Sequence, residues 1–168
     1  KIFEAFYLKL NPMKKMPIFR FLVFLIVNFV ALGLGGMFTG SGVVSDWYQQ
    51  LNQAPWTPPG WVFGAAWTSI MICFSFYMAL LLDDFANRKI NIGLYLTQWV
   101  LNVIWNPIFF YYHFTVFALF IILLLTLLIA FILYRNRAFM KWKSILIMPY
   151  LIWLIIATSL NAYIVFFN

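Results

Sequence analysis

Apolar residues in this chain form five long runs, and short polar stretches separate them. A helix needs about 20 mostly apolar residues to cross the hydrocarbon core of a bilayer. Each run therefore predicts one membrane-spanning helix, and the five lie at about residues 18–38, 61–82, 92–112, 114–134 and 144–167. Arg20 and Asn28 interrupt the first run, whereas the second contains no charged residue.

The third and fourth runs are almost continuous from residue 92 to residue 134. That length is too great for a single crossing, so the chain must reverse within it. Pro107 and the Tyr111-Tyr112-His113 step mark the reversal, since proline disfavours helix continuation. We expect a tight helical hairpin at this point.

All eleven basic residues lie in three segments that alternate with segments lacking any base. These segments are the N-terminal segment, the second connection and the fourth connection; the bases are Lys1, Lys9, Lys14, Lys15, Arg20, Arg88, Lys89, Arg135, Arg137, Lys141 and Lys143. Five crossings place all three segments on one side of the bilayer. Basic connections are retained in the cytoplasm, so we expect a cytoplasmic N-terminus and a C-terminus outside.

The composition supports an all-α integral membrane protein with a five-helix bundle. Hydrophobic residues make up 65% of the chain and charged residues 9%, against about 45–50% and about 25% in soluble domains. The net charge of +7 does not indicate a nucleic-acid partner, because the bases sit between apolar runs. A bacterial inner membrane is the expected location, since no targeting segment is visible.

Residues 1–16 are interpreted as an N-terminal cytoplasmic segment, of which residues 1–12 are either a small interfacial helix or a cloning remnant, and residues 17–168 as the membrane domain. A cleaved signal peptide is the alternative for the first run, but that run exceeds the usual apolar length and no A-x-A site follows. The connection at 39–60 is rich in glycine, proline and tryptophan. It is either an ordered lid or an interfacial anchor belt.

Polar side chains inside the predicted helices recur at helical spacing and share faces. On the third helix these are Gln98, Asn102 and Asn106, with Trp105 beside them. The fifth helix has a matching stripe of Tyr150, Trp153, Ala157, Leu160 and Asn161, and on the second helix Gly60, Gly64, Trp67 and Met71 align. The amides could simply join helices. Because most tryptophans fall in the outer half, we favour a pocket there for a flat, largely apolar ligand.

The residue types needed for common catalytic and metal sites are scarce. The chain has one cysteine, Cys73, and one histidine, His113. No carboxylate falls inside a predicted span, where ion-coupled transporters usually carry one. We therefore predict no metal site, no required cofactor and no firm catalytic residue.

Three segments carry a family resemblance: APWTPPGWVFGAAW at 54–67, preceded by Trp47-Tyr48; LNVIWNPIFF at 101–110; and PYLIWLIIATSLN at 149–161. Together they resemble the tryptophan-rich sensory protein/translocator protein family, TspO/MBR, once called the peripheral-type benzodiazepine receptor. The resemblance implies a five-helix bundle, often a homodimer, that binds porphyrins such as protoporphyrin IX. It also implies that the first loop closes the pocket.

Carried over by position, the family's pocket falls on Trp47, Trp61, Phe63, Gly64, Trp67, Asn102, Trp105, Phe117, Trp153, Ala157 and Leu160. Trp67 and Trp153 match the tryptophans tied to porphyrin photochemistry. Our full set of expected ligand-binding residues adds Trp56, Asn106, Tyr150 and Asn161. Phe117 replaces a tryptophan of animal members, and no base follows Tyr163. Sterol binding through the animal motif is therefore not expected.

These features predict a membrane receptor or sensor for porphyrin-type tetrapyrroles, such as protoporphyrin IX or haem precursors, that regulates tetrapyrrole level or a stress response. Two alternatives stay open. One is light-dependent degradation of porphyrin through Trp67 and Trp153. The other is transport of porphyrin or another amphipathic ligand.

Overall fold

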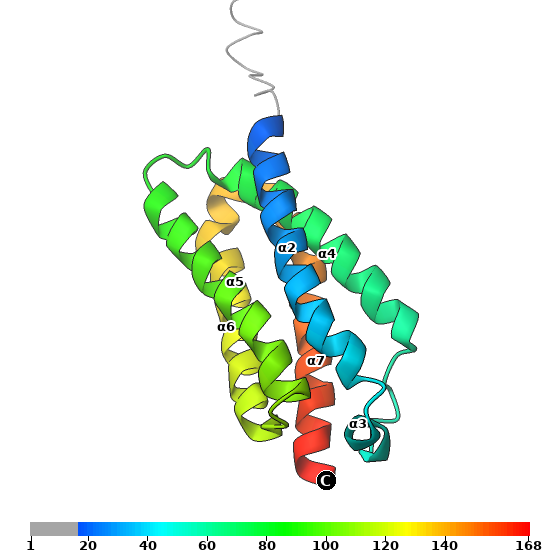
Figure 1. Cartoon of the computed structure of the whole chain (residues 1–168). Helices are drawn as coiled ribbons and strands as arrows, with labels where there is room; N and C mark the ends of the chain where they lie inside the picture. Colours follow the sequence, from blue (N-terminus) through cyan, green and yellow to red (C-terminus); the bar gives the residue numbers. More distant parts are fainter. Residues whose placement is uncertain (1–16) are drawn as a thin grey trace, which may run out of the picture.

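The computed structural model describes residues 17–168, and this part of the chain is helical without strands (Figure 1). The predicted segment 1–16 lies outside the described residues. The helices are α2 (Ile18–Gly42), α3 (Asp46–Gln50), α4 (Gly60–Leu81), α5 (Arg88–Phe110), α6 (Thr115–Met140), the 3₁₀ helix η1 (Lys141–Ile147) and α7 (Met148–Phe167).

Five long helices form a bundle in which each packs against its neighbours in the order α4, α2, α5, α6, α7 and back to α4. In Figure 1 the described chain enters at the top with α2, and the C-terminus lies at the bottom. We call the end with the start of α2 and with η1 the basic end. The end with α3 and the C-terminus is the lid end.

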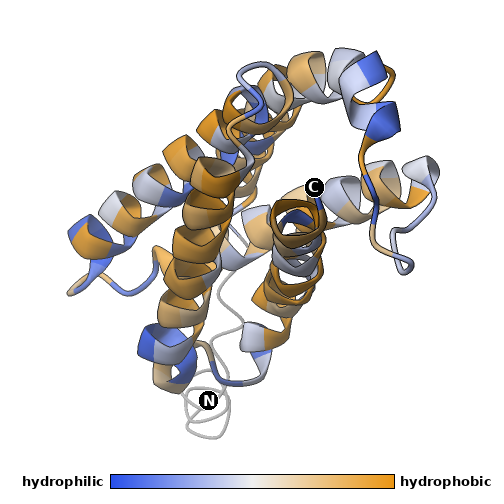
Figure 2. Ribbon diagram, turned by 90° about the horizontal axis from the view of Figure 1, so that it is seen from below, coloured by the Kyte–Doolittle hydropathy of each residue, from blue (hydrophilic) through white to orange (hydrophobic). Residues whose placement is uncertain are grey.

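Three stretches of the described chain are long and apolar enough to cross a membrane: Ile18–Gly42, Gly60–Leu81 and Thr115–Phe167. The last has 53 residues and comprises α6, η1 and α7, which fold back on one another. The helix α5 is less apolar, because it carries two bases and several amides. Figure 2 shows hydrophilic residues gathered mainly at helix ends and in the connections.

Several helices differ in length from the apolar runs that predict them. The helix α2 continues to Gly42 instead of ending near 38, and α6 continues to Met140 instead of 134. The helix α5 already begins at Arg88, whereas α7 begins only at Met148, after η1. Hydropathy locates the hydrocarbon core, whereas backbone hydrogen bonding continues a helix into the polar zone beyond it.

The predicted hairpin between the third and fourth helices is present. The helix α5 ends at Phe110, just beyond Pro107, and α6 begins at Thr115. The N–H of Tyr111 donates to the carbonyl of Pro107 over 2.9 Å. His113 adopts a φ of 57°, in the left-handed region, which reverses the chain within a short turn.

The main core lies toward the basic end and is closed by aromatic and aliphatic side chains of α4, α6 and α7. On α4 the buried residues all fall between Ile70 and Leu81, and none lies in the preceding part of the helix. Tyr77 and Tyr150 are among the largest fully buried side chains. The basic half of the bundle is therefore the densely packed half.

Hydrogen bonds between helices run through this core. The Tyr95 hydroxyl donates to Oδ1 of Asn28 over 2.8 Å, and Nδ2 of Asn28 donates to the Ser75 hydroxyl over 2.9 Å. The Tyr150 hydroxyl donates to Oε1 of Gln98 over 3.0 Å. All five side chains are buried, so these bonds satisfy groups that would otherwise be costly inside a membrane.

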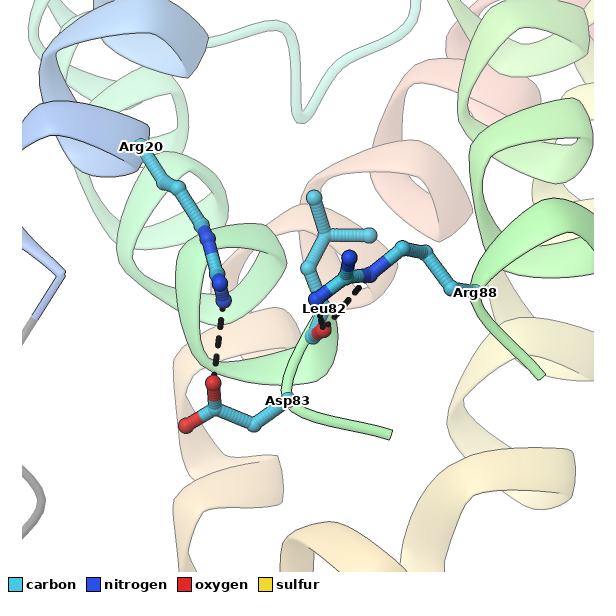
Figure 3. A network of polar contacts seen from close by, with 4 residues as sticks. All are labelled: Arg20, Leu82, Asp83 and Arg88. Atoms are coloured by element: carbon cyan, nitrogen blue, oxygen red, sulfur yellow. Dashed lines mark hydrogen bonds and ion pairs between the residues drawn. The ribbon is translucent and has the colours of Figure 1, made fainter. Parts of the chain in front are cut away.

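At the basic end, charged groups tie α2, α4 and α5 together (Figure 3). Arg20 pairs with Asp83 over 2.9 Å. The guanidinium of Arg88 donates through two nitrogens to the carbonyl of Leu82, over 3.1 and 2.9 Å. The described bases of the three basic segments thus meet at one end of the bundle, as five antiparallel crossings require.

Candidate ligand-binding site

A small apolar pocket lies at the lid end, between the connection from α2 to α4 and the helices α4, α5 and α7. We call it the lid-end pocket, and define it by its lining residues: Tyr48, Gln53, Ala54, Thr57, Phe63, Trp105, Phe109, Phe110, Ala157, Leu160, Asn161 and Ile164. Its interior volume is about 50 Å³. Sites for drug-sized ligands measure about 300–1,000 Å³, so this conformation is closed.

One wall of the pocket is an aromatic stack on α5. Trp105 lies parallel to Phe109, with ring centroids 5.1 Å apart, and meets Phe110 edge-on at 5.8 Å. The indole N–H of Trp105 donates to Oδ1 of Asn161 over 3.2 Å, and Nδ2 of Asn161 donates to the carbonyl of Thr115 over 3.0 Å. Asn161 therefore joins α5, α6 and α7 and fixes the Trp105 ring.

The facing wall comes from α4 and α7. Phe63 meets Trp153 edge-on with centroids 5.2 Å apart, and Trp67 meets Tyr150 in the same way at 5.9 Å. Trp153 is only 6% exposed, and its indole nitrogen has no hydrogen-bond partner in the described chain. An unpaired buried donor costs about 1–3 kcal/mol. The indole N–H of Trp153 is thus an unpaired buried donor behind Phe63.

The connection from α2 to α4 covers the pocket. Ala54, buried in this connection, lines the pocket together with Gln53 and Thr57. Tyr48, on α3, packs against Phe110 at 5.6 Å. Burial raises the pKa of the Tyr48 phenol above its ordinary value, because the charged phenolate is poorly solvated there. The phenol therefore stays protonated at neutral pH and can donate a hydrogen bond.

Contacts at both edges hold this lid segment, residues 43–59, closed. Trp47 stacks on His113 with centroids 4.0 Å apart and an angle of 15° between the rings. Nδ2 of Asn52 donates to the carbonyl of Phe167 over 3.0 Å. The indole N–H of Trp56 donates to the Ser159 hydroxyl over 3.1 Å. Of the two interpretations left open for this segment, an ordered lid agrees better with these contacts.

The structure brings only part of the expected residue set to the pocket lining. Phe63, Trp105, Ala157, Leu160 and Asn161 line it. Behind the lining, Trp153 and Tyr150 are buried, and Trp67 packs on Tyr150. Asn102 is also buried, on α5. Trp47 and Trp56 act from the lid through His113 and Ser159 instead of lining the pocket.

Trp61 and Gly64 differ from the expected arrangement, because in the first half of α4 only the face with Phe63 and Trp67 packs on the bundle. Trp61 is 75% exposed. Gly64 is exposed, and a Cβ added there would meet nothing within 4 Å. The Trp61 ring therefore lies on the bundle surface in this conformation, where interfacial tryptophans are common.

Asn106 faces α2 instead of the pocket. Its Oδ1 accepts a hydrogen bond from the Thr39 hydroxyl over 2.8 Å, and its Nδ2 donates to the Asn102 carbonyl over 2.9 Å. Gly35 makes room for it, since a Cβ there would lie 2.6 Å from Nδ2. Residues four apart on a helix differ by about 40° in direction. The direction of the Asn106 side chain around the helix axis therefore differs by about 80° from that of Gln98.

Phe117 also lies away from the lid-end pocket. It is 57% exposed on α6 and lines a shallow open hollow with His113 and Phe120. The next residue, Ala118, is fully buried. The helix α6 has a buried stripe packed on α5 and α7 along one side, and large exposed apolar residues on the other.

Sequence reasoning missed seven lining residues: Tyr48, Gln53, Ala54, Thr57, Phe109, Phe110 and Ile164. Phe109 and Phe110 end the LNVIWNPIFF segment, so their motif carried a usable signal. Tyr48, Ala54 and Thr57 likewise belong to the first motif segment, but only the folded loop decides which of its residues turn inward. Among the described residues, no three His, Cys, Asp or Glu side chains lie together as metal ligands.

Comparison with known proteins gives consistent matches. The sequence profile of the TspO/MBR family matches residues 22–167. The tryptophan-rich sensory protein of Cereibacter sphaeroides is 33% identical over 116 residues, 69% of this chain and 73% of that protein. The tryptophan-rich protein TspO of Archaeoglobus fulgidus is 30% identical over 154 residues, covering 88% and 96%. The human translocator protein is 32% identical over 134 residues, covering 75% and 79%.

Proposed function

This chain belongs to the TspO/MBR family of membrane proteins, and on that premise we propose that it is a receptor for a porphyrin-type tetrapyrrole bound in the lid-end pocket. Through that binding it senses or regulates tetrapyrrole level or a stress response. The observation that carries the proposal is an aromatic pocket backed by an unpaired buried donor, the indole N–H of Trp153, which lies behind the lining residue Phe63.

The chemistry of the pocket suits a flat aromatic ligand. Phe63 and Trp105 line the pocket, and the indole of Trp153 backs Phe63. Aromatic pairs contribute about 0.5–1.5 kcal/mol each beyond the area that they bury. A tetrapyrrole offers a large planar face to such rings. Its carboxylates or pyrrole nitrogens can accept the hydrogen bond that Trp153 leaves unmade.

The closed pocket must enlarge before a tetrapyrrole enters. The contacts to be released are those of Trp47 with His113, Asn52 with Phe167 and Trp56 with Ser159. All three lie at the edge of the lid segment. Hydrogen bonds of this kind contribute about 0.5–1.5 kcal/mol each. Ligand binding is therefore coupled to lid opening, and the ligand replaces these contacts with aromatic burial.

The proposal includes an orientation and a setting. The basic end lies in the cytoplasm and the lid end outside, since basic connections are retained inside. We place the protein in a bacterial inner membrane as a homodimer joined through an exposed apolar helix face. No cofactor is required, and sterol is not the proposed ligand.

Titration with protoporphyrin IX tests the binding site. Trp153→Phe keeps a ring and removes the donor, so the Kd should rise roughly five- to tenfold, as expected for one lost hydrogen bond. The readout is quenching of tryptophan fluorescence in detergent or nanodiscs. Trp142→Phe, at the basic end, is the matched control and should bind as wild type does. If Trp153→Phe and Trp105→Phe both bound protoporphyrin IX with wild-type affinity, the pocket assignment would be wrong.

Light-dependent degradation of the bound porphyrin is the second candidate. Phe63, Trp153, Trp67 and Tyr150 form edge-to-face aromatic pairs at the pocket wall, and tryptophan is readily oxidised by an excited porphyrin and dioxygen. Illumination of the complex in air should give a new absorbing product, and Trp67→Phe with Trp153→Phe should suppress it. A product that free porphyrin forms equally well would dismiss this activity.

Transport is the remaining alternative. The five long helices contain no Asp or Glu, and ion-coupled transporters usually depend on such groups. This favours a sensor over a coupled transporter. Protein-dependent porphyrin flux into proteoliposomes would reverse that order.

A further inference from the structure

The chain makes a strained turn where α6 passes into η1. The helix α6 ends at Met140, and Lys141 adopts a φ of 50° and a ψ of −128°. This left-handed region favours glycine, and a larger residue there is strained by about 1–3 kcal/mol. Buried Met140 and Ile147 hold the turn on either side. The turn leaves Lys141 and Trp142 exposed, with Trp142 77% exposed.

The chain around this turn is rich in bases and lacks acids. From residue 85 to residue 168 it contains six bases and no Asp or Glu: Arg88, Lys89, Arg135, Arg137, Lys141 and Lys143. Among the described residues, the acids at this end are Asp83 and Asp84, which lie in the α4–α5 connection and bind Arg20 and Asn87. Within residues 17–168, the side of the basic end formed by α6 and η1 therefore carries a net positive charge.

Among the described residues, two of these bases have hydrogen-bond partners, and the three at the turn have no carboxylate partner. Arg88 binds the Leu82 carbonyl, and Arg135 donates to Oδ1 of Asn87 over 2.9 Å. In contrast, no described carboxylate lies within ion-pair distance of the bases at positions 137, 141 and 143. These three side chains are close in sequence around one turn, and no carboxylate of the described chain neutralises them.

Aromatic rings accompany the bases. The guanidinium of Arg137 lies 4.3 Å from the centroid of the Tyr134 ring. Trp142 separates Lys141 from Lys143. Tyrosine and tryptophan concentrate at the level of lipid headgroups, where an amphipathic ring meets both the acyl and the polar zones. The turn thus combines charge with the residue types that mark headgroup depth.

We propose that Arg137, Lys141, Trp142 and Lys143, the cationic turn, bind the phosphate of an anionic phospholipid, such as phosphatidylglycerol, in the leaflet at the basic end. The guanidinium and the two ammonium groups surround the phosphate, and Trp142 packs beside the glycerol and upper acyl region. Charge-assisted bonds to phosphate are among the stronger hydrogen bonds in proteins. The site is separate from the lid-end pocket and does not depend on the tetrapyrrole.

A general role in topology explains bases at this end without any lipid site. Bases also stabilise the C-terminus of a helix such as α6 through its dipole. Neither explanation predicts that one lipid molecule stays bound at the turn or that phosphatidylglycerol is preferred to phosphatidylcholine. A headgroup site instead predicts that bases of the cationic turn matter more than others and that phosphatidylglycerol is preferred to phosphatidylcholine.

Native mass spectrometry of the full chain, titrated with defined lipids, distinguishes these cases. Phosphatidylglycerol should remain bound at one molecule per chain in preference to phosphatidylcholine. Each Lys or Arg near an anionic surface contributes about 1 kcal/mol, so Lys141→Gln should weaken retention roughly fivefold. The triple variant Arg137→Gln/Lys141→Gln/Lys143→Gln should weaken it on the order of 100-fold. Lys89→Gln removes the same charge from another exposed position and should change retention less than twofold.

Three outcomes would overturn the proposal. Equal weakening by Lys89→Gln and Lys141→Gln would show bulk electrostatics only. Equal retention of the two lipids would show no selection for charge. Displacement of phosphatidylglycerol by inorganic phosphate at matched ionic strength would show a free-anion site. Circular dichroism of each variant verifies that the bundle is folded.

A second measurement locates the lipid without relying on charge removal. Phosphatidylglycerol with brominated acyl chains, in vesicles of otherwise unlabelled phosphatidylcholine, should quench part of the tryptophan fluorescence. Trp142→Phe should abolish that part. Unchanged quenching in Trp142→Phe would place the lipid elsewhere and overturn the assignment.

Discussion

The two halves of this bundle use the same helices for different purposes, and α4 shows the contrast most clearly. Eight residues of α4 are buried between Ile70 and Leu81, whereas its first ten residues, Gly60 to Ser69, include none that is buried. The basic half is packed like a core. In the lid half, α4 contributes one loosely covered wall to a pocket.

The hydrogen bonds of the two halves differ in the same sense. In the basic half, Asn28 joins buried groups of α4 and α5. At the lid end, Asn52 and Trp56 make exposed bonds between the lid and α7. Breaking a buried bond leaves polar atoms without water, whereas exposed groups regain it. The comparison indicates a rigid base that supports a half able to open.

The largest predicted effect comes from Asn28→Leu in the basic half. The substitution leaves the Tyr95 hydroxyl without its acceptor in a buried site. The free energy of unfolding should fall by about 1–3 kcal/mol, measured by detergent-titrated unfolding followed by circular dichroism. A wild-type unfolding curve for this variant would contradict the view of the basic half as the stable base.

Gly35→Ala should have the next largest effect. Its Cβ would lie 2.6 Å from Nδ2 of Asn106, so α2 and α5 must separate or Asn106 must give up its bond to Thr39. We expect a loss of about 1–2 kcal/mol, typical of overpacking. Gly36→Ala is the matched control, because a Cβ there meets nothing within 4 Å. Equal unfolding midpoints for the two variants would show that the close contact is unimportant.

Asn52→Ala should affect stability less and ligand entry more. The variant loses an exposed bond from the lid to the Phe167 carbonyl, which contributes at most about 0.5–1.5 kcal/mol. We expect an unchanged global unfolding midpoint and faster binding of protoporphyrin IX in stopped-flow quenching. If Asn52→Ala lowered the unfolding midpoint as much as Asn28→Leu does, the contrast between the halves would fail.

Trp61→Phe should have the smallest effect. Trp61 is 75% exposed, and its ring lies outside the pocket lining. The Kd for protoporphyrin IX should change less than twofold, whereas Trp105→Phe, which loses the bond to Asn161, should weaken binding severalfold. A large loss of affinity in Trp61→Phe would mean that the first half of α4 turns inward when the lid opens.

The sequence by itself determined the long helices, the hairpin and which helix ends lie together. Helix length and apolar content are local properties, so runs of about 20 residues locate the spans. The placement of all bases in alternate segments fixed which ends meet, and Arg20 indeed pairs with Asp83 of the second basic segment. The motif segments identified the family and placed Trp105, Asn161 and Phe63 at one site.

Only the tertiary structure decided which of the candidate side chains share the pocket. Asn106 and Asn102 read alike in the sequence, yet the close approach of α2 at Gly35 and the rotation along α5 direct Asn106 to Thr39. Trp61 and Phe117 lie on the surface because no neighbouring helix of the described chain covers them. Side-chain direction depends on which helix lies opposite, and that is a property of the assembled bundle.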